Sequence, residues 1–329
     1  MDISVVVPAY NERDSLPELM KQIHAAVTDL NLTYEVIVVD DGSNDGTFEV
    51  LKSLRSEYPT LRAIRFRRNY GKSPALSEGF KLVKGKFVIT MDADLQDDPR
   101  EIKNLLAKLE EVDMVSGWKK VRHDPISKTF PSKIFNFVTS KITGINIHDF
   151  NCGLKGYRKE VIDSLNVYGE MHRFLPVLAN WQGFRVGEIV VQHHARKFGK
   201  SKYGFARIFN GLFDLMTVIF LTRFRTSPLH VFGMVGLASF SSGFLIELYI
   251  TAQKLMGIPI KQRPLFFLGI LLLIVGVQFV GFGLVAEMIS AHQAENVRYS
   301  IREHIGLDRD QQLATETEKG PHIGDIPVD

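Results

Sequence analysis

The stretch Phe87-Val88-Ile89-Thr90-Met91-Asp92-Ala93-Asp94-Leu95-Gln96 decides the fold of this chain. Its first half is apolar and β-branched, which is typical of a strand buried on both faces of a parallel sheet. Asp92 and Asp94 follow directly, and such alternate positions can aim two oxygen ligands at one divalent ion. Ligands of parallel sheets bind beyond the carboxyl ends of the strands, so we expect the functional residues there.

Further short apolar runs alternate with amphipathic stretches along the chain before residue 200. These runs are Ile3–Val7, Glu35–Val39, Ala63–Phe66, Met114–Ser116 and Val186–Val191. Apolar residues from Leu16 to Leu30 recur at helical spacing, and Asp97 and Asp98, ahead of Pro99, are interpreted as helix caps. The alternation predicts an α/β fold with a mostly parallel sheet covered by helices on both faces.

Two more strand ends carry polar residues, Pro8-Ala9-Tyr10-Asn11-Glu12 and Asp40-Asp41-Gly42-Ser43. Carboxylates gathered at neighbouring strand ends repel one another, so a cation must offset them. No Gly-x-Gly-x-x-Gly follows the first strand, and no Gly-x-x-x-x-Gly-Lys-Ser/Thr phosphate loop occurs. These absences disfavour dinucleotide dehydrogenases and P-loop ATPases. A bound nucleoside diphosphate would instead be neutralised through a carboxylate-held metal.

Composition and cysteine content set further limits. Lys plus Arg number 40 and Asp plus Glu 37, a formal charge of +3, so no charge extreme defines the partner. Cys152 is the only cysteine, which rules out an internal disulfide and disfavours a structural zinc site. No basic stretch precedes the apolar start of the chain, so we expect no secretory signal and a cytosolic location for this part.

The last third of the chain predicts two membrane-spanning helices. Pro264–Ala286 has no charged residue and would be roughly 35 Å long as a helix, more than the roughly 30 Å of a hydrocarbon core. Leu229–Ile246 is the second run, and a Gly-Ile-Pro turn between the two predicts an antiparallel hairpin. Arg223, Arg225, Arg298 and Arg302 flank its open end, against Lys254, Lys261 and Arg263 in its turn, which slightly favours a cytosolic open end. A pair of buried helices in a soluble protein is the alternative.

The stretch His193–Arg225 is basic and leads into the short apolar segment Ile208–Leu221, which Asp214 interrupts. Its basic residues are Arg196, Lys197, Lys200, Lys202, Arg207, Arg223 and Arg225. A basic loop followed by an amphipathic segment predicts a helix lying against anionic headgroups.

The motifs at the first, second and fourth strand ends together resemble the signatures of family 2 inverting glycosyltransferases of the GT-A fold. The polyprenyl-phosphate branch, with dolichol-phosphate mannose synthase and the undecaprenyl-phosphate glucosyltransferases, is the most similar, and the likeness runs from residue 3 to about residue 300. It implies a GT-A catalytic domain over 1–202, interface helices over 203–227, a hairpin over 228–290 with helices at about 229–252 and 264–288, and a cytosolic tail over 291–329. The polar composition of Leu307–Asp329 predicts that the end of this tail is disordered.

The resemblance also assigns residues. It implies that the nucleotide is bound by Pro8, Ala9, Tyr10, Glu12, Val39, Asp41, Asp92 and Ala93, and that Mg²⁺ or Mn²⁺ is held by Asp92, Asp94 and Gln96. The acceptor and phosphate ligands would be Lys119, His172, Arg173, Arg196, Ser201 and Lys202. The catalytic set would be Asp94, Asp149, Arg196 and Lys202, with Asp149 orienting the acceptor or the sugar hydroxyls. Lys119 stands where the mannose synthases carry an arginine, and a lysine cannot make a bidentate phosphate contact.

The implied reaction transfers a hexose from a nucleoside-diphosphate sugar to polyprenyl phosphate with inversion, at the cytoplasmic membrane with the catalytic domain in the cytosol. Glucose from UDP-glucose is the favoured donor, with GDP-mannose, UDP-N-acetylhexosamine and aminoarabinose donors as alternatives. A homo-oligomer packed through the membrane helices is expected.

Three other functions stay open. A processive polysaccharide synthase would be expected to carry a Gln-x-x-Arg-Trp motif and more membrane helices. A non-catalytic membrane partner would not need the acidic and basic motifs. Transfer to a lipid without a phosphate would need a clear general base.

Overall fold

A seven-stranded sheet forms the N-terminal part of the computed structural model, which describes residues 1–120, 126–165, 167, 171–194, 228–257 and 264–294. The strands are β1 Ile3–Ala9, β2 Tyr34–Asp40, β3 Leu61–Arg65, β4 Phe87–Thr90, β5 Met114–Trp118, β6 Lys155–Arg158 and β7 Val186–Val190. Their order is β3-β2-β1-β4-β6-β5-β7. Every pair is parallel except the two that β6 makes, so the predicted mostly parallel α/β sheet is confirmed.

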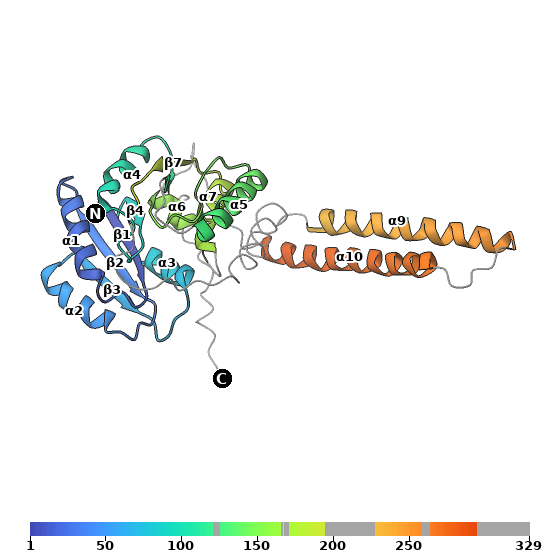
Figure 1. Cartoon of the computed structure of the whole chain (residues 1–329), viewed down its shortest axis with the longest axis horizontal. Coiled ribbons are helices and arrows are strands. Elements are labelled where there is room, and N and C mark those ends of the chain that lie inside the picture. The colour runs from blue at the N-terminus through green and yellow to red at the C-terminus, as the bar shows by residue number, and fades with distance from the viewer. Residues whose placement is uncertain (121–125, 166, 168–170, 195–227, 258–263, 295–329) are drawn as a thin grey trace, which may run out of the picture. The chain divides into compact units, whose positions relative to one another are not determined.

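Helices cover both faces of this sheet (Figure 1). They are α1 Leu16–Thr28, α2 Thr47–Glu57, α3 Lys72–Lys81, α4 Ile102–Lys108, α5 Ile126–Thr143, α6 Lys159–Ser164 and α7 Leu175–Trp181. Successive strand residues alternate between two cores: Val5 and Val7 pack with α1, α2 and α4, whereas Val6 packs with α3, α6 and α7. This two-residue period is why near-continuous apolar strands predict burial on both faces.

Strand β6 was not predicted from the sequence, because Lys155-Gly156-Tyr157-Arg158 is short and has no apolar run. It inserts between β4 and β5 and runs antiparallel to both. Since β6 is reversed, it begins at the edge where β4 and β5 end. The segment that precedes β6 therefore lies at the same edge of the sheet as the acidic strand ends.

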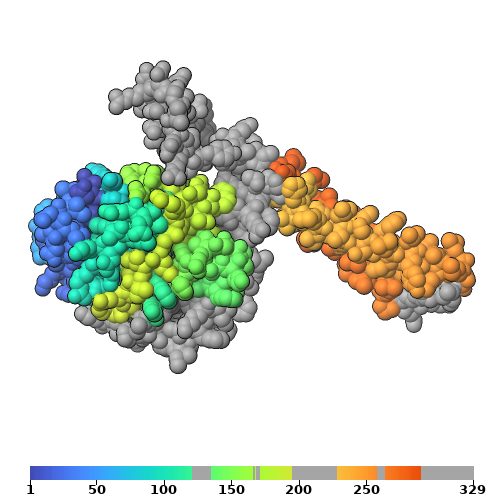
Figure 2. All heavy atoms as spheres, turned by 90° about the horizontal axis from the view of Figure 1, so that it is seen from above, coloured from blue at the N-terminus to red at the C-terminus, as the bar shows by residue number. Residues whose placement is uncertain are grey.

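The C-terminal helices are α9 Pro228–Leu255 and α10 Pro264–Ala294, both long and apolar enough to span a membrane. Only 11% of each span is buried, which is unlike the core helices of a soluble protein. The two helices pack side by side (Figure 2). Glycines permit this close approach, since a Cβ on Gly243 would lie 2.7 Å from the carbonyl oxygen of Gly269. The predicted interface helices at 203–227 and most of the predicted tail lie outside the described residues.

Candidate active site

The turn after β4 presents the first two carboxylates of the site. The backbone N–H of Gln96 donates to Asp94 Oδ1 at 3.2 Å. Leu95, between them, has a φ of 60°, a left-handed backbone conformation that residues other than glycine rarely adopt. Asp92, Asp94 and Gln96 are all half-buried, while Ala93 and Leu95 point into the core. The alternation expected from the sequence thus brings the three predicted metal ligands to one rim.

Lysines surround Asp92. The Lys72 ammonium, at the start of α3, forms an ion pair with Asp92 Oδ1. Burial raises the pKa of Asp92, but Lys72, Lys119 and Lys155 outweigh it and bring that pKa down to about 2. Asp92 is therefore a carboxylate at any physiological pH. The positive charges of the three lysines also favour the binding of an anion nearby.

Gly153 closes one side of Asp92. A Cβ at this position would clash with the Asp92 carboxylate, so any larger residue would displace that side chain. The Thr90 hydroxyl donates to the Gly153 carbonyl at 2.9 Å and fixes the approach. The segment before β6, predicted to serve the acceptor, thus lies against the predicted metal site.

Lys119 and Asp97 form a second ion pair, with 2.7 Å between Lys119 Nζ and Asp97 Oδ1. The Asp97 side chain is fully buried, so the interpretation of Asp97 as a helix cap is wrong. Asp98 is the cap, accepting the backbone N–H of Arg100 at 3.0 Å. Asp97 turns inward because Lys119, at the end of β5, supplies a buried counter-charge. Whether Lys119 also contacts phosphate stays a prediction.

Lys155 is a further cation, 3% exposed, whose ammonium donates to the carbonyl of Cys152. Burial lowers its pKa to about 8, with Lys72 acting in the same direction and the carboxylates of Asp149 and Asp92 opposing. Burial also raises the pKa of the Cys152 thiol to about 12, so this cysteine is not a ready nucleophile.

The ends of β1 and β2 meet through backbone contacts. Asn11, with a φ of 54°, donates its N–H to Ser43 Oγ at 2.8 Å. Asp41 accepts the N–H groups of Tyr70 and Gly71 at 2.7 and 2.9 Å, yet burial raises its pKa. A hollow of about 480 Å³ opens beside this junction, lined by Gly42, Ser43, Arg65, Phe66 and Arg67.

The residues predicted to bind the nucleotide divide into two kinds. Pro8, Tyr10 and Glu12 are half-buried at this edge, whereas the side chains of Ala9 and Val39 are buried in the core. Ala9 and Val39 can therefore offer a ligand only their backbone atoms.

Two acceptor-side motifs also reach this region. Asp149 is 1% exposed, and its Oδ1 accepts the N–H of Asn151 at 3.1 Å. His172 Nδ1 lies 2.8 Å from Ser73 Oγ, next to Lys72 on α3. Burial, with help from Lys72, lowers the pKa of His172 well below 6.5. His172 is therefore neutral and positions α3, and the neighbouring Arg173 is buried.

Stability should depend on pH through His172. Its native pKa lies below the unfolded value of 6.5, so below that pH the unfolded chain binds a proton that the native protein does not. The free energy of unfolding should fall on acidification, by up to about 1.4 kcal/mol per pH unit for one proton. His172→Gln should flatten the slope in denaturant titrations from pH 7 to pH 5, and the exposed-residue control His24→Gln should not. An unchanged slope in His172→Gln would contradict the assignment.

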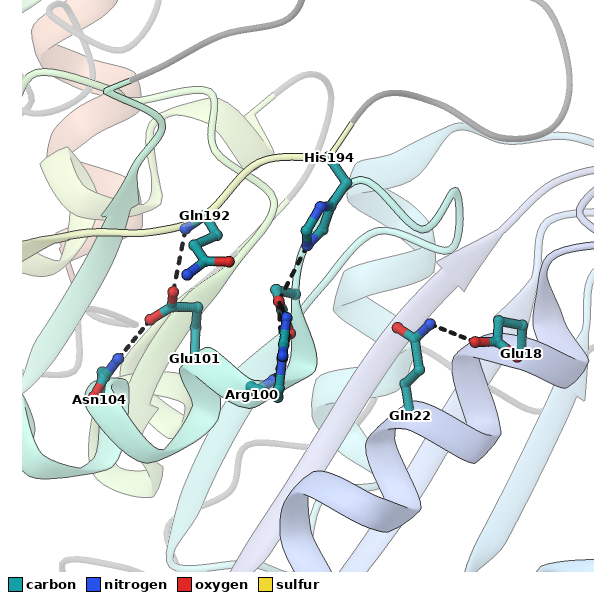
Figure 3. Close-up of polar contacts among 8 residues, drawn as sticks. Glu18, Gln22, Arg100, Glu101, Asn104, Gln192 and His194 are labelled. Atoms are coloured by element: carbon teal, nitrogen blue, oxygen red, sulfur yellow. Dashed lines mark hydrogen bonds and ion pairs between the residues drawn. The ribbon is translucent and has the colours of Figure 1, made fainter.

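The chain leaves β7 along the start of α4 (Figure 3). His194 Nε2 lies 3.1 Å from Asp98 Oδ2, and the Gln192 N–H donates to Glu101 Oε1 at 3.2 Å. The N–H of His194 also donates to the Gln96 carbonyl at 2.9 Å. The basic stretch therefore begins beside the predicted metal ligands, although the predicted Arg196, Ser201 and Lys202 lie outside the described residues.

The donor set fits a hard divalent cation. Carboxylate and amide oxygens of Asp92, Asp94 and Gln96 are ligands that Mg²⁺ and Mn²⁺ accept. Within the described ranges, no cluster of three or more His, Cys, Asp or Glu side chains could hold a metal by itself. An ion here would complete its shell with water or substrate oxygens, as Mg²⁺ commonly does.

Sequence reasoning missed Lys72 and Lys155. A signal for Lys72 existed, because Gly71-Lys72-Ser73 follows the third strand at the edge where ligands were expected. Lys155 could not be placed without knowing that β6 lies between β4 and β5.

Comparison with known proteins identifies the family. Residues 4–165 match the model of glycosyl transferase family 2. The chain is 38% identical to dodecaprenyl-phosphate galacturonate synthase from Rhizobium johnstonii, over 88% of each chain. It is 36% identical to undecaprenyl-phosphate 4-deoxy-4-formamido-L-arabinose transferase from Shewanella sediminis, over 98% of this chain and 96% of that protein.

Among solved structures, glucosyl-3-phosphoglycerate synthase from Mycobacterium tuberculosis, in complex with Mn²⁺, UDP and phosphoglyceric acid, has a similar fold. Its TM-score is 0.53 at 18% identity, over 67% of this chain and 77% of that one. Mannosyl-3-phosphoglycerate synthase from Rubrobacter xylanophilus gives 0.52 at 16%, over 68% and 75%. With its GT-A architecture and its polyprenyl-phosphate glycosyltransferase relatives, the chain belongs to glycosyl transferase family 2.

Proposed function

We propose that this glycosyltransferase moves one sugar from a nucleoside-diphosphate sugar to a polyprenyl phosphate, with inversion at the anomeric carbon. The observation that carries the proposal is the pairing of two features in one chain. An acidic rim at Asp92 and Asp94, ringed by lysines, suits a metal-bound diphosphate, and two helices long and apolar enough to span a membrane suit a lipid acceptor. Both relatives named above act on polyprenyl phosphates.

The acceptor chemistry explains the absence of an obvious strong base among the described site residues. A phosphate monoester oxygen is already anionic near neutral pH, so it attacks the anomeric carbon without losing a proton. The bond from that carbon to the diphosphate oxygen breaks, and the nucleoside diphosphate leaves with the electron pair. Asp149, held by the Asn151 N–H, orients the acceptor or the sugar hydroxyls.

Charge compensation is the main task of the site, because both reactants are anions. A Mg²⁺ or Mn²⁺ held by Asp92, Asp94 and Gln96 would neutralise the diphosphate and stabilise the leaving group. Arg196 and Lys202 are proposed to offset the acceptor phosphate. The membrane helices hold the lipid tail near the site and so raise its effective concentration. Nucleotide sugars are made in the cytosol, so the sheet domain faces the cytosol at the cytoplasmic membrane.

Lys202→Ala should slow transfer by about tenfold or more, the effect of one lost charge-assisted contact of about 1.5–3 kcal/mol. The rate should be measured with saturating donor over a range of polyprenyl phosphate concentrations. Lys21→Ala, which removes an exposed lysine of α1, serves as the matched control. A rate for Lys202→Ala equal to that of the wild type would make Lys202 a membrane contact only.

The identity of the sugar is the finer part of the proposal. Glucose is predicted from the sequence, whereas the named relatives carry galacturonate and formamido-arabinose, which suits the aminoarabinose alternative. The test is a screen of UDP- and GDP-sugars with the purified full chain, undecaprenyl phosphate and Mg²⁺ or Mn²⁺. Mass spectrometry should show one sugar added to the lipid phosphate. Products with several sugars would indicate a processive synthase, and no product with any donor would overturn the proposal.

A further inference from the structure

The ion pair between Lys72 and Asp92 links two parts of the candidate site at the same edge of the sheet, the ends of β2 and β4. Lys72 is the first residue of α3, and the preceding Gly71 is tied to the β2 end through its N–H bond to Asp41 Oδ2 at 2.9 Å. From this anchored start the lysine reaches across to the end of β4. The Lys72 and Asp92 side chains are 24% and 34% exposed, so solvent and ligands can reach the pair.

Asp92 has little room for a second cation while Lys72 is bound. The Gly153 backbone packs against the carboxylate on one side, and the ammonium holds Oδ1 on the other. A divalent ion at Asp92 would stand next to this ammonium, and like charges at such a distance repel strongly outside bulk water. Lys72 and a metal therefore compete for one carboxylate.

The surroundings of Lys72 favour an anionic ligand, with which the lysine could pair after a metal displaces it from Asp92. Lys155 lies close enough to add its positive charge to that of Lys72, and Gly71, the N-cap residue of α3, provides no side-chain cap. The first turn of a helix of this length and an adjacent lysine favour a phosphate group. A donor diphosphate would thus attract the Lys72 ammonium away from Asp92.

We propose that Lys72 occupies the Asp92 carboxylate while the metal is absent and passes to the donor diphosphate when the metal binds, an inference that rests on the proposed function. Metal and nucleotide then bind as a unit, because each removes an obstacle to the other. By reciprocity, the factor by which UDP strengthens metal binding equals the factor by which the metal strengthens UDP binding.

The experiment measures Mn²⁺ binding rather than turnover. The full chain in detergent is titrated with Mn²⁺ alone and with Mn²⁺ plus UDP, and free Mn²⁺ is read by electron paramagnetic resonance. UDP affinity at saturating Mn²⁺ is measured by calorimetry. For Lys72→Met we expect Mn²⁺ alone to bind about tenfold more tightly and UDP about tenfold more weakly, the order of one charge-assisted contact.

Two more variants keep the inference testable. Lys72→Arg can pair with Asp92 through two parallel bonds, so Mn²⁺ alone should bind about threefold more weakly than to the wild type. Lys81→Met removes an exposed lysine of the same helix, which pairs with Glu78, and should bind like the wild type.

Equal Mn²⁺ affinities for methionine, lysine and arginine at position 72 would overturn the inference. So would a weaker affinity in Lys72→Met for both ligands, which is the behaviour of a lysine that only supports the site. If the wild type binds no Mn²⁺ with or without UDP, the metal site of the proposed function fails, and the inference fails with it.

Discussion

Replacement of Asp94 by alanine should reduce sugar transfer at least about 100-fold and leave the protein folded, because it removes a charge that acts mainly on the transition state. The Asp94 side chain is half-buried at the rim of the site and not in the core, so we expect the fold to survive its truncation. Its proposed metal would no longer be held against the diphosphate at the moment when the leaving group gains charge. Transfer is measured as lipid-linked product per unit time, and folding by a thermal melt in detergent.

Two controls separate this effect from a general defect. Asp163→Ala removes an exposed carboxylate of α6 that pairs with Lys159, and its transfer rate should not change. Chelation of divalent ions should reduce wild-type transfer by a similar factor and leave the residual Asp94→Ala rate unaltered. Metal-dependent transfer by Asp94→Ala at the wild-type rate would refute the assignment of Asp94.

The largest stability loss is expected for Lys119→Met. Lys119 Nζ lies 2.7 Å from Asp97 Oδ1, and the Asp97 side chain has no exposed area. Removing one partner leaves a buried charge uncompensated, which typically costs about 3–5 kcal/mol. Both tryptophans, Trp118 and Trp181, lie in the sheet domain, so denaturant unfolding can be followed by their fluorescence.

A double variant tests the cause. Lys119→Met combined with Asp97→Asn leaves no unpaired charge at these two positions and should recover part of the lost stability. Lys120→Met removes the neighbouring exposed lysine and should stay within about 0.5 kcal/mol of the wild type. If Lys119→Met is as stable as the wild type but loses transfer, Lys119 serves phosphate binding, as its position in the sequence predicts.

Parallel strands and their acidic ends were predictable because they rest on local patterns. Ile3–Ala9 and Phe87–Thr90 are mostly apolar, with Ser4 and Thr90 as the exceptions, and polar residues follow each strand within two positions. Strand β6 was not predictable, since Lys155–Arg158 becomes a strand only by pairing with β4 and β5, which lie far away in the sequence. Once β6 is held in the sheet, its Tyr157 is buried against Phe80 of α3, and no periodicity of its own predicts that burial.

The candidate site was predictable to the same extent. Asp92, Asp94 and Gln96 form a compact motif in the sequence, and the structure gathers them at one rim. The cations that neutralise Asp92 come from three separate strand ends or helix starts, so no local pattern could join them. Asp97 shows the converse error. Its local pattern is typical of a helix cap, but its side chain is buried and pairs with Lys119, which is distant in the sequence.

The reversed strand makes the segment from Asp149 to Lys155 intolerant of insertions and deletions. Side chains alternate along β6, so a slip of one residue exchanges the two faces of the sheet. The ring of Tyr157 would then point where Gly156 now lies, and even a single carbon there would be 3.1 Å from the Leu109 side chain. Homologues that differ in length should therefore carry their extra residues elsewhere, and engineered loop grafts that vary sugar preference should keep this segment at its natural length.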